Sequence, residues 1–320
     1  MGFPLGDWID AHAGVPHNLG ASGMVGSLQS VAGSLARLPA PDPDRLRRRL
    51  AVGVGVPSDA LFLTHGASEA NAIVLHFLAG TLRTRLGRAP RLRVEAPEYP
   101  PIPDTGRVAG FRVVGSGGAA DAAALSAPRN PLGTPVGDGE LDDLADGTLA
   151  LLVDETFREF SDRPSSARAR SPGRWITGTF TKAYGGDAIR VGYVAAPPES
   201  VEPFAYYHGL VTDRVPLQSV SAALALLRDR RTILAETRRI FRSNERALRD
   251  AFPDLPPLGA PVWFDRGVDG DRLARRAVRA GVLVCPGSYF GAPHAVRIGL
   301  TRRTFPADLQ AYLAVRKSGR

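Results

Sequence analysis

The 320-residue chain is predicted to form an α/β protein with two unequal domains. Short apolar segments, such as 61–64, 149–153 and 175–180, alternate with longer segments whose apolar residues recur at helical spacing. This alternation is typical of a mostly parallel sheet with helices on both faces. After Pro197 and Pro198 the pattern changes to long helices mixed with a few short strands, which indicates a smaller α+β domain.

These patterns divide the chain into an N-terminal arm (1–40), a large domain (41–200) and a small domain (201–320). The arm is rich in Gly, Ser and Ala and favours one helix at about 23–38. In the large domain we expect helices at 45–54, after the cap Asp42-Pro43, and at 69–82, and strands at 61–64, 91–95, 111–114, 149–153, 175–180 and 191–195. In the small domain we expect helices at 217–252, interrupted near Asp229, at 272–280 and at 307–315, and strands at 262–264, 282–284 and 296–300.

Composition excludes several classes of protein. The net charge of +8 suggests nucleic-acid binding, but the arginines are scattered and often lie beside Asp or Glu, so no nucleic-acid partner is expected. No run of about 18 apolar residues predicts a membrane span, and the N-terminus does not resemble a signal peptide. The histidines show no metal-ligand spacing. For this reason no metal is expected. The single cysteine, Cys285, cannot form an intrachain disulfide, so a cytoplasmic protein is expected.

Lys182 is the first candidate for catalysis. Only two of the 40 basic residues are lysine, and the other, Lys317, lies near the C-terminus. Arginine stays charged at any workable pH and is a poor nucleophile. A desolvated lysine can lose its proton and form a Schiff base with a carbonyl compound. Because an apolar strand precedes Lys182, a surface lysine is the weaker interpretation.

Polar or glycine-rich segments follow the predicted strands. In parallel α/β sheets, ligands bind beyond the carboxyl ends of the strands, so we expect these segments to form one site. They are 66–68, Tyr99, Asn130, Asp154 and 179–182.

Each of these segments alone has a plainer interpretation. Gly66-Ala67-Ser68 suits a phosphate at a helix N-terminus, but Ser68 could simply cap that helix. Asn130 could belong to a turn. Asp154 follows four apolar residues and therefore needs a partner, which is either a cationic ring nitrogen or one of the many arginines.

The segment around Lys182 is more specific. Thr179 and Thr181 place two hydroxyls beside the amine, and Arg190 follows eight residues later. Hydroxyls and a guanidinium suit a phosphate, while the amine suits a carbonyl. Together they indicate a phosphorylated aldehyde as ligand.

In order and spacing these motifs resemble the class I/II aminotransferases, which are pyridoxal-5′-phosphate (PLP) enzymes of fold type I, and in particular the histidinol-phosphate aminotransferase-like branch. The resemblance extends from about Pro41 to Leu300. The matching segments are Pro41-Asp42-Pro43, 64–70 (THGASEA), 130–133 (NPLG), 154–157 (DETF), 179–182 (TFTK), 190–193 (RVGY), 286–291 (PGSYFG) and 296–298 (VRI).

The resemblance implies a role for each candidate residue. Lys182 would carry the PLP aldimine and then move the substrate α-proton, and Asp154 would keep the ring nitrogen protonated. Arg297 would bind the substrate α-carboxylate, and Asn18 of the arm would line the substrate pocket by analogy. The other implied cofactor contacts are Asn130 to the ring 3′-oxygen, Tyr99 on the ring face, Phe157 beside the ring, and Gly66, Ala67, Ser68, Thr179, Thr181 and Arg190 around the phosphate.

The implied function is an aminotransferase, acting as a homodimer, that moves the amino group of an L-amino acid to a 2-oxo acid. Two departures from the family matter. Phe157 replaces a tyrosine whose hydroxyl binds the 3′-oxygen, and because threonine-phosphate decarboxylase-like relatives tolerate Phe here, a decarboxylase or lyase is an alternative. Ala40 replaces a tyrosine that reaches the partner subunit's phosphate. A non-catalytic PLP-fold binding module is a third possibility, which the intact candidate residues oppose.

Overall fold

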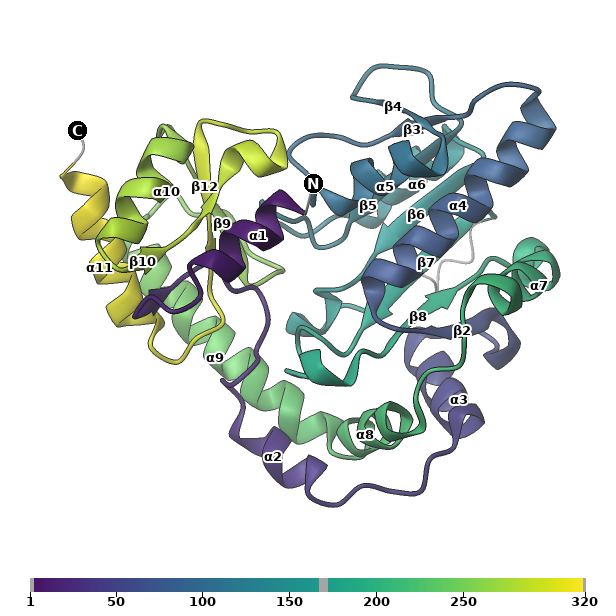
Figure 1. Ribbon diagram of the computed structural model, residues 1–320, viewed down its shortest axis with the longest axis horizontal. Helices are drawn as coiled ribbons and strands as arrows, with labels where there is room; N and C mark the ends of the chain where they lie inside the picture. Colours follow the sequence, from purple (N-terminus) through teal and green to yellow (C-terminus); the bar gives the residue numbers. More distant parts are fainter. Residues whose placement is uncertain (1–2, 167–171, 319–320) are drawn as a thin grey trace.

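A seven-stranded sheet forms the centre of the large domain in the computed structural model, which describes residues 3–166 and 172–318 (Figure 1). Neighbouring strands are parallel, except that β8 runs antiparallel to both β2 and β7. The mostly parallel sheet predicted from the sequence is therefore confirmed. In spatial order the strands are β2 (Leu61–Thr64), β8 (Gly192–Ala195), β7 (Arg174–Thr179), β6 (Ala150–Asp154), β5 (Ala122–Ser126), β3 (Arg91–Arg93) and β4 (Arg112–Val114).

Helices cover both faces of this sheet, as the sequence predicted. Successive residues of β7 show the division, because Trp175 belongs to one hydrophobic core and Ile176 to the other. The Trp175 face packs against α4 (Ala67–Leu86), α5 (Pro101–Ala109) and α7 (Val201–Val211), and the Ile176 face against α3 (Pro43–Val54), α6 (Asp138–Asp146) and α8 (Leu217–Arg228).

The small domain contains a three-stranded antiparallel sheet with helices against it. Helix α9 (Arg230–Ala251) runs from the large domain into this domain (Figure 1). The boundary predicted near residue 200 falls before α7 and α8, which pack on α4 and α3 of the large domain. The remaining elements are β9 (Val262–Arg266), α10 (Gly270–Arg279), β10 (Val282–Leu283), β11 (Cys285–Pro286), β12 (Ala295–Gly299) and α11 (Phe305–Lys317).

The N-terminal arm joins the two domains. Strand β1 (His17–Asn18) pairs with β10 of the small domain, and the Met24 N–H donates to the Lys182 carbonyl of the large domain at 3.0 Å. The arm also contains α1 (Pro4–Ala11), which the sequence did not predict, and α2 (Gln29–Leu35), which is shorter than the helix expected there. Among the helices described, none is both long and apolar enough to cross a lipid bilayer.

Candidate active site

The structure brings the candidate residues together at one edge of the large sheet. Strands β2, β3, β5, β6 and β7 run in the same direction, so their carboxyl ends lie along that edge. The small domain and the arm lie against it, because Arg297 bonds to Asn130 there and Ser22 reaches Lys182. The candidate site therefore lies where three parts of the chain meet, and we call this junction the cleft.

Lys182 lies half-buried in this cleft, just after β7. Its Nζ is 3.4 Å from the Oγ of Ser22, a contact that the sequence did not reveal. Burial, followed by the positive charge of Arg297, lowers the pKa of the Lys182 amine to about 8. A substantial fraction of the amine is therefore neutral near physiological pH and can act as a nucleophile.

Asp154 ends β6 and is held by neutral hydrogen-bond donors. The Nδ2 of Asn71 and the N–H of Thr156 each donate to its carboxylate at 2.9 Å, and Thr177 Oγ1 donates to Asn71 Oδ1 at 2.6 Å. No arginine pairs with Asp154 in the part of the chain that the structure describes, so the ion-pair alternative is absent there. Burial raises the pKa of this carboxyl, and a cationic ring nitrogen would lower it.

Asn71 was not identified from the sequence. It interrupts the apolar face of α4, where its neighbours Ala70, Ile73 and Val74 are buried in the core. A buried polar residue on an otherwise apolar helix face needs a partner, and this signal could have identified it.

The start of α4 and the loop after β7 bring together polar groups suited to a phosphate. Gly66 has φ +99°, and a side chain there would lie 3.0 Å from an Arg190 nitrogen. Arg190 itself has φ +45° and is the only non-glycine residue with a positive φ among those described. The hydroxyls of Thr179 and Thr181 lie 2.8 Å apart beside it. Ala67 and the exposed Ser68 occupy the first turn of α4, whose N–H groups lack partners within the helix.

Arg297 lies on β12 and is only 2% exposed. Its guanidinium donates to Asn130 Oδ1 at 3.2 Å and to the Gly20 carbonyl at 2.9 Å, and it lies 5.0 Å from the centre of the Phe290 ring. Its Nε has no hydrogen-bond partner and no carboxylate pairs with it within residues 3–166 and 172–318. A buried cation without an anion is suited to bind a carboxylate ligand.

Three further candidates have defined surroundings. Asn18 Oδ1 accepts the N–H groups of Gly20 and Ala21 at 3.0 and 3.1 Å, which orients the turn whose carbonyl meets Arg297. Tyr99 packs edge-on against Phe3, with ring centres 6.3 Å apart. Phe157 is buried in the main core and contacts Phe160, with ring centres 6.0 Å apart, so its contacts are apolar packing.

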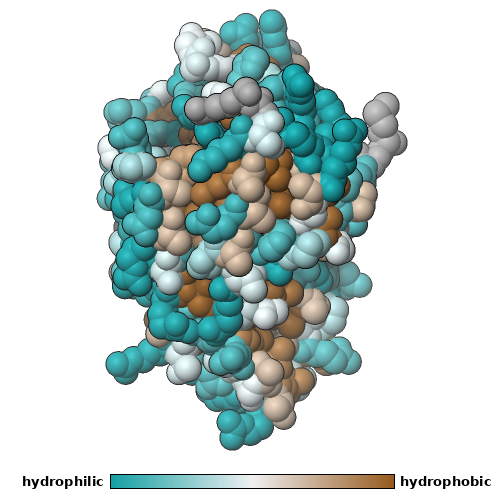
Figure 2. All heavy atoms as spheres, turned by 90° about the vertical axis from the view of Figure 1, so that its left-hand side faces the viewer, coloured by the Kyte–Doolittle hydropathy of each residue, from teal (hydrophilic) through white to brown (hydrophobic). Residues whose placement is uncertain are grey.

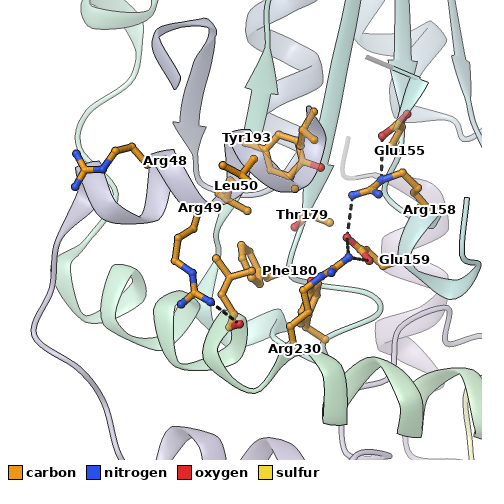
Figure 3. Close-up of a pocket in the computed structure, with 15 residues that line it drawn as sticks. Arg48, Arg49, Leu50, Glu155, Arg158, Glu159, Thr179, Phe180, Tyr193 and Arg230 are labelled. Atoms are coloured by element: carbon orange, nitrogen blue, oxygen red, sulfur yellow. Dashed lines mark hydrogen bonds and ion pairs between the residues drawn. The ribbon is translucent and has the colours of Figure 1, made fainter. Parts of the chain in front are cut away.

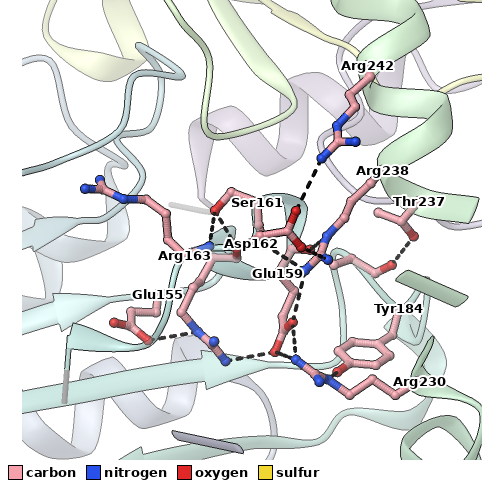
Figure 4. A network of polar contacts seen from close by, with 12 residues as sticks. Glu155, Glu159, Ser161, Asp162, Arg163, Tyr184, Arg230, Thr237, Arg238 and Arg242 are labelled. Atoms are coloured by element: carbon pink, nitrogen blue, oxygen red, sulfur yellow. Dashed lines mark hydrogen bonds and ion pairs between the residues drawn. The ribbon is translucent and has the colours of Figure 1, made fainter. Parts of the chain in front are cut away.

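A cavity of about 420 Å³, whose lining includes Thr179, lies on the α3 side of the sheet (Figure 3). Its charged groups pair mainly with one another: Arg158 contacts Glu155 at 3.1 Å and Glu159 at 2.8 Å, and Arg230 contacts Glu159 at 2.9 Å. The network continues along α9, where Arg238 and Arg242 contact Asp162 (Figure 4). These contacts fasten α9 to the segment that follows Asp154.

The cleft residues fit PLP chemically. The cofactor combines an anionic phosphate, an aldehyde and a basic ring nitrogen. The helix N-terminus with Arg190 is suited to the phosphate, and the Lys182 amine to the aldehyde. Asp154, which has no charged partner at hydrogen-bond distance among the described residues, is suited to a protonated ring nitrogen.

Comparisons with known proteins show which family the chain resembles. The model of the family described as aminotransferase class I and II matches residues 121–306. The chain is 31% identical over 286 residues to the histidinol-phosphate aminotransferase of Symbiobacterium thermophilum, which covers 79% of this chain and 75% of that protein. It is also 31% identical over 173 residues to an aromatic amino acid aminotransferase of Nocardia farcinica, which covers 50% of this chain and 48% of that protein.

Solved structures share the fold. A PLP-dependent aminotransferase from Streptococcus suis superposes with a TM-score of 0.81 at 18% identity, covering 99% of this chain and 96% of that one. The aspartate aminotransferase of Thermus thermophilus with maleate gives 0.79 at 19% identity, covering 98% and 95%. From the family match and the relatives, the chain belongs to the class I and II aminotransferases, a family of PLP-dependent enzymes of fold type I.

Proposed function

We propose that this enzyme transfers the amino group of an L-amino acid to a 2-oxo acid and that Lys182 is its catalytic residue. The observation that carries the proposal is the Lys182 amine, whose pKa is lowered to about 8 in the cleft that also contains Asp154 and Arg297. When bound, PLP supplies an aldehyde that condenses with amines and a ring that withdraws electrons.

The other cleft residues bind and orient. Arg190 and the first turn of α4 would hold the phosphate together with the two threonine hydroxyls, and Asn130 and Tyr99 would set the orientation of the ring. The carboxylate of Asp154 would stabilise a protonated ring nitrogen, and Asn71 holds that carboxylate in place. Such preorganised groups need little rearrangement during the reaction.

Arg297 and Lys182 act on the amino acid. The guanidinium of Arg297 binds the α-carboxylate through a pair of N–H donors, which orients the α-carbon toward the lysine. The Nζ of Lys182 then removes the proton from that carbon. Ser22 contacts Nζ from the arm and limits its movement.

The chain offers a matched test, because it has only two lysines. Borohydride reduction of the PLP-loaded protein should attach the cofactor to the peptide that contains Lys182. Lys182→Ala should abolish this label and turnover together, while Lys317→Ala should keep both. A label that survives in Lys182→Ala would refute the assignment. Product analysis should find a 2-oxo acid, and release of carbon dioxide would instead indicate the decarboxylase alternative.

We further propose that the substrate has an apolar or aromatic side chain. Arg297 contacts Phe290 and Cys285, which belong to an apolar cluster with Leu5 of α1 and Leu132. Tyr99 packs on the same cluster, so a side chain between Arg297 and Tyr99 meets apolar groups. Burial of apolar surface would stabilise such a substrate.

Charge at the edge of this cluster disfavours a phosphorylated substrate. Burial raises the pKa of Tyr289, and the carboxylates of Asp271 and Asp7 raise it further, although Arg275 opposes them. These carboxylates would repel a phosphate. We therefore expect kcat/KM for L-phenylalanine to exceed that for histidinol phosphate by about tenfold or more. A higher kcat/KM for histidinol phosphate would refute the apolar substrate class but would not contradict the proposed transamination.

We also propose a cytoplasmic homodimer. Large apolar side chains are exposed on α7 and the start of α8, namely Tyr206 (75%), Leu210 (66%), Val211 (50%) and Leu217 (54%). On the small-domain side of the molecule, apolar patches are instead broken up by polar side chains (Figure 2). An apolar group of this kind is typical of a subunit interface.

Sedimentation at several protein concentrations tests the homodimer. Leu210→Asp should shift the protein toward monomer, whereas Val108→Asp, at a still more exposed site on α5, should not. An unchanged dimer in Leu210→Asp would place the interface elsewhere, and a monomeric parent protein would refute the dimer.

A further inference from the structure

Glu98 is a buried carboxyl to which the proposed reaction gives no role. It lies between β3 and α5, directly before Tyr99, and is 4% exposed. No cation pairs with it in the portion of the chain that the structure describes. Its partners are the N–H of Tyr99 at 2.6 Å, the N–H of Ser126 at 2.9 Å and the hydroxyl of Ser126 at 2.6 Å.

The hydrogen bonds to Glu98 all suit an ionised carboxylate. Both backbone groups can only donate, and the Ser126 hydroxyl already accepts the N–H of Asn130 at 2.8 Å, so its proton is free for Glu98. Burial raises the pKa of Glu98 to about 7, while the bonds from Ser126 and Tyr99 oppose that rise. A buried carboxylate without a cation lowers the stability of the folded protein. This cost indicates that Glu98 has a role in the candidate site.

Through these bonds Glu98 connects two loops that follow different strands. Tyr99 follows β3, and Asn130 follows β5. The connection to Asn130 runs through Ser126 Oγ, and Asn130 Oδ1 in turn accepts from Arg297 at 3.2 Å. One carboxylate therefore stands at the head of a chain of hydrogen bonds that ends at the proposed substrate anchor.

We propose that Glu98 is a positioning residue that fixes Tyr99 and Asn130 relative to each other and so sets the orientation of the cofactor ring. The inference rests on the cofactor contacts proposed above for these two residues. If Glu98 stops accepting, the Ser126 hydroxyl turns to another acceptor and the Asn130 N–H loses its fixed partner. The loop that contains Asn130, whose side chain contacts Arg297, then becomes less rigid.

Two variants test this proposal in the PLP-loaded protein. Glu98→Gln keeps the side-chain volume but directs an NH2 group at neighbours that are themselves donors. Ser126→Ala keeps Glu98 and the bond to Tyr99 but removes the hydroxyl that leads to Asn130. Glu95→Gln, three residues earlier at an exposed site, is the matched control.

The measurements are cofactor affinity, visible circular dichroism of the bound cofactor and thermal stability. Glu98→Gln should weaken PLP binding about tenfold, since a hydrogen bond to a charged group is lost, and should reduce the dichroism band. Ser126→Ala should change the band in the same direction, and Glu95→Gln should match the parent. A merely structural role would lower Tm and leave the band of the folded, loaded protein unchanged, which would overturn the proposal.

The outcomes separate this inference from the proposed function. A parent protein that binds no PLP, or that is labelled away from Lys182, refutes the function itself. If the parent protein is labelled at Lys182 but both Glu98→Gln and Ser126→Ala show the same dichroism as the parent, only the proposed role of Glu98 is refuted.

Discussion

The protonation of Lys182 depends on its surroundings in the cleft. Burial disfavours the ammonium form, and the nearby guanidinium of Arg297 acts in the same direction, while Asp187 and Asp154 oppose both. The net result is a pKa of about 8, below that of a free lysine. The amine is therefore mainly protonated below pH 8 and mainly neutral above it.

From this pKa we predict the pH dependence of cofactor loading. The rate at which the apoprotein takes up PLP, followed by absorbance, should rise with pH and level off above about pH 8, because only the neutral amine attacks the aldehyde. Arg297→Gln should move the midpoint to higher pH, since it removes a positive charge that disfavours the ammonium. Arg45→Gln, on exposed α3 surface, is the control. An unchanged midpoint in Arg297→Gln would contradict the electrostatic explanation.

A second prediction at the residue scale concerns Asn71. Asn71→Ala removes a donor to Asp154 and leaves the Thr177 hydroxyl without its acceptor. We expect a loss of about 1–3 kcal/mol in the free energy of unfolding, measured with urea, and a lower kcat. Thr177→Val keeps the contact to Asp154 and should lower kcat less. Equal losses of kcat in both variants would show that the contact to Asp154 is not what matters.

At the scale of elements, α9 is anchored beside the edge of the sheet that carries the candidate site. Arg230 and Arg238 on this helix both contact Glu159, which follows Asp154 by five residues (Figure 4). Arg242 extends the same helix face to Asp162. Because α9 continues into the small domain, this network fixes the position of the helix that connects the two domains.

We predict that this network stabilises the fold more than surface ion pairs do. Glu159 is largely buried and serves several arginines, so Glu159→Gln should lower the free energy of unfolding by about 1–3 kcal/mol. Asp44→Asn breaks an exposed pair with Arg47 and should cost about 0–1 kcal/mol. Urea denaturation of the two variants in the same buffer makes the comparison. Equal effects would mean that the network contributes no more than a surface pair.

At the scale of the whole molecule, three parts of the chain meet at the candidate site. The arm bonds to both domains, through Leu283 of β10 and through Lys182. Trp8 of α1 donates to the Val284 carbonyl at 2.9 Å, which holds α1 against the small domain. A ligand in the cleft therefore touches all three parts and should stabilise them together.

Removal of the cofactor should therefore lower the melting temperature. At a PLP concentration of about 100 times Kd, binding adds about 2.7 kcal/mol, or roughly 5 °C in Tm for a chain of this size. Differential scanning calorimetry of the apo and loaded protein measures the shift. Lys182→Ala should show a smaller shift because it lacks the covalent bond, and identical shifts in the two proteins would argue against that bond.

The amino-acid sequence by itself determined the α/β class, most of the large-domain strands and the edge at which the site forms. These features depend on local patterns: apolar runs of strand length, helical spacing and polar residues at strand ends. The motifs around Asp154 and Lys182 indicated the same edge, because parallel strands bring their carboxyl ends together.

Only the tertiary structure decided the features that depend on contacts between distant residues. Helix α5 escaped prediction because its first turn is rich in proline, which is tolerated there, and packing on α4 supports it. The direction of β8, the packing of α7 on α4 and of α8 on α3, and the partners of Arg297 all arise from long-range pairing. Asn71 and Glu98 are polar residues that bond to Thr177 and Ser126, which lie 106 and 28 positions away, and no local pattern specifies such pairs.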